Sequence, residues 1–428
     1  MRTGRGATAA HLGPGRRCAG PSMGFVGRCH PPSRPGCHTL MSSGARRVLH
    51  VIVPQKAGAV GGADLHVRDL AVAQRRAGSW QPLILAPRAT AHYLGLLSEA
   101  GLPVVTTPPP HGIRCLAELP RRHGVALVHA HGYEANYLLA SMRLLTGTWR
   151  RIPAAVTAHG WIETTRWLHL KSALDRRSGR VAAIAFATAH RHVHQLDHPG
   201  RTASIVVHNG IDPPDPSRLE DLRRNRQHLR RTLGVPPDCF LAGTVGRLSQ
   251  EKRLDLFLEA ARSVAAASPA AHFLVVGGGS ELPHLRSIAV ALGLDQRVTF
   301  TGLVDDTTSI YAALDVMVQP SDIEGSPRTV VEAMAHEVPV VATDVGDVAH
   351  LLDFGNAGVL IPRRDTTALS AAVLDLLGNG EKARALAKLG RQHYTRNFTL
   401  DRMCRAVADG YDLAFDGKDA PQRAGKPA

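Results

Sequence analysis

The sequence has few aromatic residues and no long apolar run. Phe, Trp and Tyr make up only 4% of its 428 residues, and no stretch approaches the roughly 20 uncharged apolar residues that a membrane-spanning helix requires. The low aromatic content and the lack of any recognisable nucleic-acid module argue against nucleic acid as a partner. With 44% apolar residues, the composition is typical of a soluble globular protein.

Cysteines are also few and form no recognisable set. Three lie within the first 40 residues and three are isolated: Cys18, Cys29, Cys37, Cys115, Cys239 and Cys404. None belongs to a C-x-x-C pair or has a histidine-rich partner motif, so we expect neither a zinc site nor a disulfide framework. This usage is typical of a reducing compartment, and we expect a cytoplasmic protein.

Residues 1–44 contain no aspartate or glutamate and are rich in glycine, proline and arginine. They show no apolar periodicity, so they cannot bury enough surface to fold, and we expect disorder there. The segment that starts at Met41 leads directly into the first apolar run, which favours Met41 as the biological start. A transit peptide is the alternative, whereas a secretory signal would need an apolar core that is missing.

The formal net charge is +15, which favours anionic partners such as phosphorylated substrates or anionic lipid head groups. Arginines scattered over helices more often form a solvated face. One candidate for lipid contact is the segment 164–178, which combines Trp167 and Leu168 with basic residues. A buried amphipathic helix has the same pattern, so both interpretations stay open. The expected location therefore includes the inner face of the cell membrane.

At this length the chain exceeds what one hydrophobic core usually supports, so we expect two domains. From Val48 onward, short apolar runs alternate with longer amphipathic segments, as in βα units around a parallel sheet. The expected fold is α/β, with two doubly wound parallel sheets. The expected strands are 48–53, 83–86, 126–129, 154–157, 181–186 and 204–207, and then 241–245, 273–276, 298–300, 316–319, 339–342 and 359–361.

The order of these segments predicts the domain boundaries. The Asp-Pro-Pro-Asp-Pro sequence at 212–216 is incompatible with helix and with ladder pairing, so it marks the linker. A charged helical connector is expected at 218–231. The predicted parts are a basic extension, 1–44; a first domain, 45–213; a second domain, 214–395; a final helix that can cross back to the first domain, 396–415; and a disordered polar tail, 416–428.

Ligands of doubly wound sheets bind at the carboxyl ends of the strands, so the residues after each strand are site candidates. After the first strand, a turn that ends in Gly61 and Gly62 opens a helix, whose free N–H groups favour an anionic or polar group. A tight strand-to-helix turn explains these glycines equally well. Arg247 and Lys252 follow another strand and suit a diphosphate, because arginine makes forked contacts and lysine adds a compact charge. Two exposed loop cations are the alternative.

The strand at 316–319 is followed by two carboxylates separated by seven residues, Glu324 and Glu332. Pro327 suits the first turn of a helix, so Glu324 is expected on the loop and Glu332 inside the helix. A carboxylate on the loop can accept hydrogen bonds from sugar hydroxyls, and one in the helix can bind the two hydroxyls of a ribose. The N–H groups between them are placed for phosphate or sugar oxygens.

This arrangement resembles the E-x7-E motif of the retaining glycosyltransferases of family 4. The resemblance covers almost the whole chain after Met41. Five further segments match that family in its order along the chain: Gly61-Gly62-Ala63-Asp64, Val156-Thr157-Ala158-His159-Gly160, His208-Asn209-Gly210-Ile211-Asp212, the G-R-x-x-x-x-K pattern from Gly246 to Lys252, and Val276-Gly277-Gly278-Gly279.

The resemblance implies a glycosyltransferase B-type fold, in which two Rossmann-like domains face a central cleft. The domain at 45–213 would be on the acceptor side and the domain at 214–395 would bind the nucleotide sugar. The implied reaction transfers a hexose from a nucleoside-diphosphate sugar to a glycan, lipid-linked or small-molecule acceptor with retention, in polysaccharide or glycoconjugate biosynthesis. No metal or other cofactor is obligatory, because cations and helix amides would stabilise the departing nucleoside diphosphate.

Transferred to this sequence, the motifs assign catalytic roles to Glu324 and His159. Glu324 would act through its charge and position rather than as a nucleophile. Arg247 and Lys252 would bind the diphosphate and Glu332 the ribose. The full set of expected donor-binding residues is Gly61, Gly62, Arg247, Lys252, Gly325, Ser326, Pro327 and Glu332.

Asp347 and His350 depart from the family's G-G-x-x-E pattern, which has a glutamate in the last position. Because that glutamate mostly supports loop packing, we expect its loss to affect fine geometry more than activity. A non-catalytic nucleotide-binding scaffold stays open as an alternative, as does a sugar-nucleotide epimerase of the same fold, which would consume donor without acceptor. His129 and His131 end a strand, but without a third ligand in view we expect no metal there.

Overall fold

The computed structural model describes residues 45–54, 60–105, 112–159, 184–190 and 203–416. All of them belong to one compact unit that spans 42–428. The predictions for the extension at 1–44, for the basic segment at 164–178 and for the tail at 417–428 lie outside the described residues. Among those that are described, no helix is both long and apolar enough to cross a membrane.

Within the described residues, the first sheet has seven parallel strands in the order β3-β2-β1-β4-β5-β6-β7. Its strands are β1 Arg46–Ile52, β2 Trp80–Leu85, β3 Val104–Val105, β4 Val125–His131, β5 Ala154–Ala158, β6 Ile184–Ala187 and β7 Ala203–Val206. The short edge strand β3 was not predicted. The helices described here are α1 Gly62–Ala77, α2 Ala91–Glu99, α3 Gly112–Arg122, α4 Gly132–Leu145 and α5 Gly147–Arg151.

Side chains alternate between the two faces of this sheet, so each strand contributes to two apolar clusters. Leu49 of β1 packs with residues of α3, α4 and α5 on one face. The neighbouring Val48 packs with α1 on the other face. Helix α1 is capped at its C-terminal end by Gly78, whose φ of 75° lies in the left-handed region that favours glycine.

The second sheet is also parallel and has the order β10-β9-β8-β11-β12-β13. Its strands are β8 Phe240–Val245, β9 Ala271–Val276, β10 Val298–Gly302, β11 Val316–Gln319, β12 Val340–Thr343 and β13 Val359–Ile361. Its other elements are α8 Pro216–Arg224, α9 Arg226–Thr232, the 3₁₀ turn η1 Gln250–Lys252, α10 Leu254–Ala267, α11 Leu282–Ala291, α12 Thr307–Ala313, α13 Arg328–Ala335, α14 Val348–Leu351, the 3₁₀ turn η2 Asp353–Gly355, α15 Thr366–Gly378 and α16 Gly380–Asn397.

The connector between the sheets differs from the prediction in two ways. Pro216 does not lie in an irregular linker but is the first residue of α8, where a proline loses no helical hydrogen bond. Asp215 caps this helix by accepting a hydrogen bond from the Ser217 N–H at 2.9 Å. The single connector helix expected at 218–231 is interrupted at Asn225, which separates α8 from α9.

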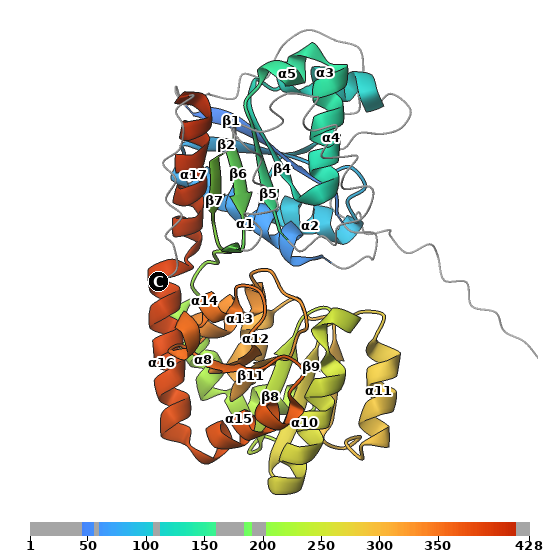
Figure 1. Ribbon diagram of the computed structural model, residues 1–428, viewed down its shortest axis with the longest axis vertical. Helices are drawn as coiled ribbons and strands as arrows, with labels where there is room; N and C mark the ends of the chain where they lie inside the picture. Colours follow the sequence, from blue (N-terminus) through green and yellow to red (C-terminus); the bar gives the residue numbers. More distant parts are fainter. Residues whose placement is uncertain (1–44, 55–59, 106–111, 160–183, 191–202, 417–428) are drawn as a thin grey trace, which may run out of the picture. The chain divides into compact units, whose positions relative to one another are not determined.

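The last described helix, α17 Leu400–Asp416, joins the core of the first sheet. Its residues Met403, Val407 and Tyr411 are buried in one cluster with Trp80 and Phe186, and Figure 1 shows α17 in red beside β6. The chain therefore passes between the two sheets twice. The two segments that cross are joined by backbone hydrogen bonds. The Ile211 N–H donates to the Phe398 carbonyl at 3.1 Å, and the Ile211 carbonyl accepts from the Leu400 N–H at 2.8 Å.

Candidate active site

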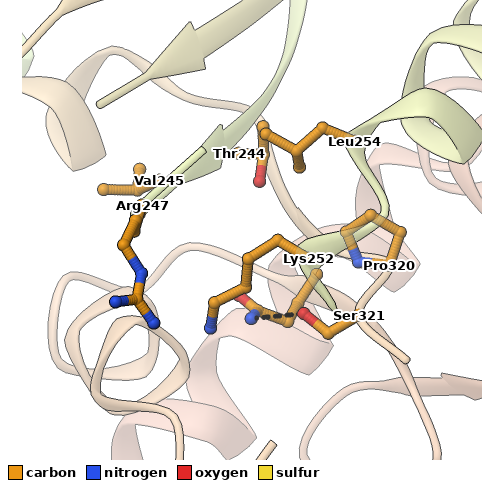
Figure 2. A pocket seen from close by; sticks show the side chains of 9 residues that line it. Thr244, Val245, Arg247, Lys252, Leu254, Pro320 and Ser321 are labelled. Atoms are coloured by element: carbon orange, nitrogen blue, oxygen red, sulfur yellow. Dashed lines mark hydrogen bonds between the residues drawn. The ribbon is translucent and has the colours of Figure 1, made fainter. Parts of the chain in front are cut away.

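A small hollow lies at the carboxyl ends of β8 and β11. It is lined by Thr244, Val245, Gly246, Arg247, Lys252, Leu254, Gln319, Pro320 and Ser321. Figure 2 shows the side chains of Arg247 and Lys252 extending in the same direction from this hollow. Two of the predicted donor-binding residues are therefore brought together at the strand ends where ligands of parallel sheets bind.

Two glycines allow the loops around this hollow to approach closely. A Cβ atom on Gly277 would lie 1.8 Å from the Gly246 carbonyl oxygen, and one on Gly279 would lie 2.1 Å from the Leu248 carbonyl oxygen. Hydrogen bonds join the same segments, because the Gly246 N–H donates to the Val276 carbonyl at 3.0 Å. The loop that carries Arg247 is thus held against the end of β9 by backbone contacts that no larger residue would permit.

The Glu324 side chain is 7% exposed and lies in a dense set of donors. Its Oε1 atom accepts hydrogen bonds from Lys252 Nζ at 2.6 Å, from Ser321 Oγ at 2.6 Å and from Gln319 Nε2. A buried carboxylate requires such partners, because an unpaired one is costly to desolvate. Glu324 is therefore a fixed negative charge next to the hollow, with Lys252 as its counter-ion.

Arg247 is more exposed than Lys252. Its guanidinium is 49% exposed and donates to Glu251 at 3.2 Å, an arrangement that contributes little stability because water screens it. The Lys252 side chain is only 22% exposed. The ammonium group carries three donors, so Lys252 can bind a ligand oxygen while it stays bonded to Glu324.

Glu332 lies in α13, as predicted, and both of its oxygens are engaged. Oε2 accepts from the Tyr311 hydroxyl at 2.9 Å and Oε1 accepts from Arg328 Nε at 2.9 Å. Burial raises the pKa of Tyr311 well above its ordinary value, so its hydroxyl stays protonated and donates. Because a carboxylate accepts about four hydrogen bonds, Glu332 keeps capacity for the hydroxyls of a ligand.

Arg328 joins the two halves of the site. Its guanidinium contacts Asp69 of α1 at 2.7 Å as well as Glu332. Burial opposes the charge of Arg328, but Asp69 and Glu332 together raise the pKa of Arg328 above its ordinary value. No role was predicted for Arg328 or Asp69, because no local pattern indicates that residues so far apart along the chain form an ion pair.

A second connection runs through Asn209. Its Nδ2 donates to the Ser326 carbonyl at 2.8 Å, and its Oδ1 lies 2.9 Å from His66 Nδ1. His66 in turn packs edge-to-face against His159, with ring centroids 4.6 Å apart. The predicted residues Ser326 and His159, from different sheets, are therefore linked through two side chains that the sequence analysis left without a role.

Buried polar atoms without a partner accumulate in this region. Within the described part of the chain, eight such side-chain atoms occur. Three of them belong to the linked residues just described: His66 Nε2, Ser326 Oγ and Arg328 Nη1. Since a buried polar atom is normally hydrogen-bonded, these three are positioned as donors and acceptors for a polar ligand.

A chain of hydrogen bonds between histidines leads to His159. Gln74 Nε2 donates to the Tyr411 hydroxyl, so Gln74 Oε1 is the atom that accepts from His50 Nε2 at 2.7 Å. His50 Nδ1 lies 2.9 Å from His131 Nε2, and His131 Nδ1 lies 3.2 Å from His159 Nε2.

The amide of Gln74 sets the direction of this chain. Burial lowers the pKa of His50 to about 4 and the pKa of His131 well below its ordinary value, so both rings are neutral near pH 7. A neutral ring donates from one nitrogen and accepts at the other. His50 therefore accepts from His131, and His131 accepts from Nε2 of His159. This fixes a proton on Nε2 of His159.

The structure corrects the expectation that His129 and His131 lack a third potential ligand. Ligand nitrogens of His50, His129 and His131 lie within 4.8 Å of one another, as do those of His66, His131 and His159. The ring nitrogens of His129 are already bonded to the Tyr411 hydroxyl at 2.5 Å and to Thr157 Oγ1 at 2.6 Å. These contacts form a polar network in the core of the first domain.

The remaining predicted donor-binding residues lie at or just before the start of a helix. Gly61 caps α1, and its N–H donates to Asp64 Oδ2 at 2.8 Å, so this N–H is already occupied by a carboxylate. Pro327 is the cap of α13 rather than a residue of its first turn. Gly325 accepts from the Asp347 N–H at 3.0 Å. Gly62 is the first residue of α1, which also carries His66 and Asp69.

Comparison with known proteins identifies the family. Residues 240–379, which include Arg247, Lys252 and both motif glutamates, match the model of the glycosyl transferases group 1. The 2-deoxystreptamine N-acetyl-D-glucosaminyltransferase of Streptomyces fradiae is 30% identical over 349 residues, which are 77% of this chain and 79% of the relative. The chain belongs to the group 1 glycosyl transferases. The predicted likeness to glycosyltransferases is thereby confirmed at the level of the group 1 family.

Other similar proteins show how far the likeness extends. The lipopolysaccharide core biosynthesis mannosyltransferase LpsB of Rhizobium meliloti (strain 1021) is 29% identical over 234 residues, which are 53% of this chain and 64% of LpsB, just under two thirds of its length. Crystallised HepE of Anabaena superposes with a TM-score of 0.73 at 22% identity, over 86% of this chain and 99% of HepE. This likeness, with the two parallel sheets, confirms the predicted B-type fold.

Proposed function

We propose that this group 1 glycosyl transferase moves a hexose from a nucleoside-diphosphate sugar to a glycan, lipid-linked or small-molecule acceptor, with retention of configuration at the transferred carbon. The observation that carries this proposal is the Lys252–Glu324 pair beside Arg247, at the strand ends of the second sheet. It combines two cations suited to a diphosphate with a fixed carboxylate suited to sugar hydroxyls. The unpartnered buried atoms of His66, Ser326 and Arg328 add to this support.

The names of similar proteins suggest which donors to test. A Mycobacterium tuberculosis relative is named a GDP-mannose-dependent phosphatidylinositol monomannoside mannosyltransferase, and it is 28% identical over 288 residues. HepE was crystallised with UDP-glucose. We therefore take UDP and GDP sugars as the candidate donors, with lipid-linked and soluble acceptors as the candidate second substrates.

In the proposed reaction, the bond between the sugar's anomeric carbon and the diphosphate breaks. The acceptor oxygen bonds to that carbon on the same face, and its proton passes to the departing phosphate oxygen. Arg247 and Lys252 stabilise the negative charge that develops on the leaving group. Glu324 orients the sugar and is a poor nucleophile, because one of its oxygens already accepts three hydrogen bonds.

His159 is proposed to contact the donor sugar, with His131 as its positioning residue. The change His131→Phe removes the acceptor for His159 Nε2–H and is expected to lower kcat about 10- to 100-fold, since a small misplacement of a reacting group has effects of this size. The donor Kd should change less than about threefold. His131→Gln restores a side chain that can accept from His159 and should recover most of kcat. Equal kcat values for the two variants would contradict this positioning role.

The donor is tested first by thermal unfolding of the full chain with UDP, GDP and their sugar conjugates. A ligand present at about 100 times its Kd should stabilise the fold by about 2.7 kcal/mol. The double variant Arg247→Ala, Glu332→Ala is expected to lose this shift. A wild-type protein whose melting temperature responds to no nucleotide would overturn the proposal.

Turnover assays separate the proposed reaction from its alternatives. A transferase releases nucleoside diphosphate at a rate that depends on the acceptor. An epimerase of the same fold would convert the donor in the absence of any acceptor. Binding without release of diphosphate, over a panel of lipid-linked and soluble acceptors, would favour the non-catalytic scaffold instead.

A further inference from the structure

We propose that His190, His208 and His350 form a binding site for a divalent transition metal such as Zn²⁺. Ligand nitrogens of these three residues lie within 4.8 Å of one another. Three imidazoles and a water molecule are a common ligand set for zinc. The residues come from both sheets, because His190 and His208 follow β6 and β7, and His350 lies in α14 after β12.

Two of these histidines form hydrogen bonds through Nδ1, which leaves Nε2 as the nitrogen that can bind a metal. The Nδ1 atom of His190 lies 2.9 Å from Asp347 Oδ2, and Nδ1 of His208 lies 3.1 Å from the Thr188 carbonyl. Because a carboxylate and a carbonyl only accept, both Nδ1 atoms carry the proton and both Nε2 atoms are acceptors. Histidines that bind metals generally donate from their other nitrogen to a carboxylate or a backbone carbonyl in this way.

His350 is the ligand that can adjust. Within the described part of the chain, its ring makes contacts with His208 and His190, at centroid distances of 4.8 and 4.7 Å, but no hydrogen bond holds it in place. Ligand nitrogens around tetrahedral zinc lie roughly 3.3 Å apart, given bonds of about 2.0 Å. Rotation of the His350 side chain is therefore the movement that would close the site.

Charge and access also suit a cation. Asp347 is 6% exposed and supplies a negative charge next to His190, whose side chain is 55% exposed. By contrast, His50 and His129 are fully buried, and both nitrogens of each ring already have partners.

The test is a titration of the metal-free full chain with Zn²⁺ at pH 7.5, followed by calorimetry. We compare the wild type with His350→Asn and with the matched control His393→Asn, which replaces a histidine that contacts the His350 carbonyl but is not a ligand. We expect His350→Asn to lose one bound Zn²⁺ or to weaken its Kd more than 100-fold, and the control to retain it. Asp347→Asn should weaken the same Kd about 10- to 100-fold, which is the usual effect of removing a residue that hydrogen-bonds to a metal ligand.

Sites elsewhere in this histidine-rich chain do not confuse the result, because only the difference between variants counts. Co²⁺ serves as a second probe, since its visible spectrum reports the number and type of its ligands. The proposal predicts a wild-type spectrum that His350→Asn changes and His393→Asn does not. It is overturned if wild type and His350→Asn bind the same number of Zn²⁺ ions with the same Kd.

Discussion

Replacing Lys252 with methionine is expected to lower kcat/KM about 10²- to 10³-fold, the usual effect of removing one group that stabilises charge in the transition state. Lys252 Nζ lies 2.6 Å from Glu324 Oε1 and borders the hollow with Arg247. Methionine keeps much of the side-chain volume but removes the charge. Steady-state kinetics with the donor found by thermal unfolding would measure the effect.

Loss of Lys252 also leaves Glu324 buried without its counter-ion, which can destabilise the fold by itself. A double-mutant cycle with Glu324→Gln separates the two effects. If Lys252 contacts the diphosphate, Lys252→Met still lowers kcat/KM at least tenfold in the Glu324→Gln background. If Lys252 only neutralises Glu324, Lys252→Met has almost no further effect on kcat/KM in the Glu324→Gln background. Lys388→Met, at an exposed lysine of α16, is the matched control and should be neutral.

The free energy of unfolding is expected to fall steeply as the pH drops from about 6.5 to 4. Burial lowers the pKa of His50 and of His66 to about 4, and lowers those of His129 and His131 well below their ordinary value. In this window the unfolded chain binds more protons than the folded one, so acid favours unfolding. The stability is fully present above pH 6.5, and each shift to about 4 removes about 2 kcal/mol at pH 5.

The shifts of His50 and His66 together remove about 4 kcal/mol at pH 5, a large part of the stability of a typical protein, and those of His129 and His131 act in the same direction. We therefore expect acid unfolding below about pH 5. Urea denaturation at pH 7.5, 6.5 and 5.5 would measure the slope of the free energy of unfolding against pH. His50→Gln can keep hydrogen bonds to Gln74 and His131 but cannot titrate, so its slope should be shallower than that of the wild type. His92→Gln, at an exposed histidine, should not change the slope. An unaltered slope in His50→Gln would show that His50 does not carry this effect.

Elements that a local sequence pattern encodes could be predicted best. Short apolar runs identified the long strands of both sheets, since a buried parallel strand is apolar on both faces. The spacing of Glu324 and Glu332 correctly placed one on a loop and one in a helix. The edge strand Val104–Val105 was missed because two residues carry no periodicity.

The parts of the site that could not be predicted depend on contacts between distant segments. Asp69 pairs with Arg328, and Gln74 hydrogen-bonds with Tyr411 of α17. No spacing rule relates these residues, because their proximity follows from how the helices pack. The roles of the predicted site residues stay predictions until the variants described above are measured.

The position of α17 has a consequence for how the protein is made. The first sheet leaves the ribosome early, but the cluster around Trp80 and Phe186 is completed only by α17, the last described helix. At 5–20 residues per second, the interval between β7 and α17 is about 10 to 40 s. The second sheet, whose two clusters draw on no residue beyond Phe398, can therefore finish folding first. During that interval the nascent first domain exposes the apolar face that α17 later covers.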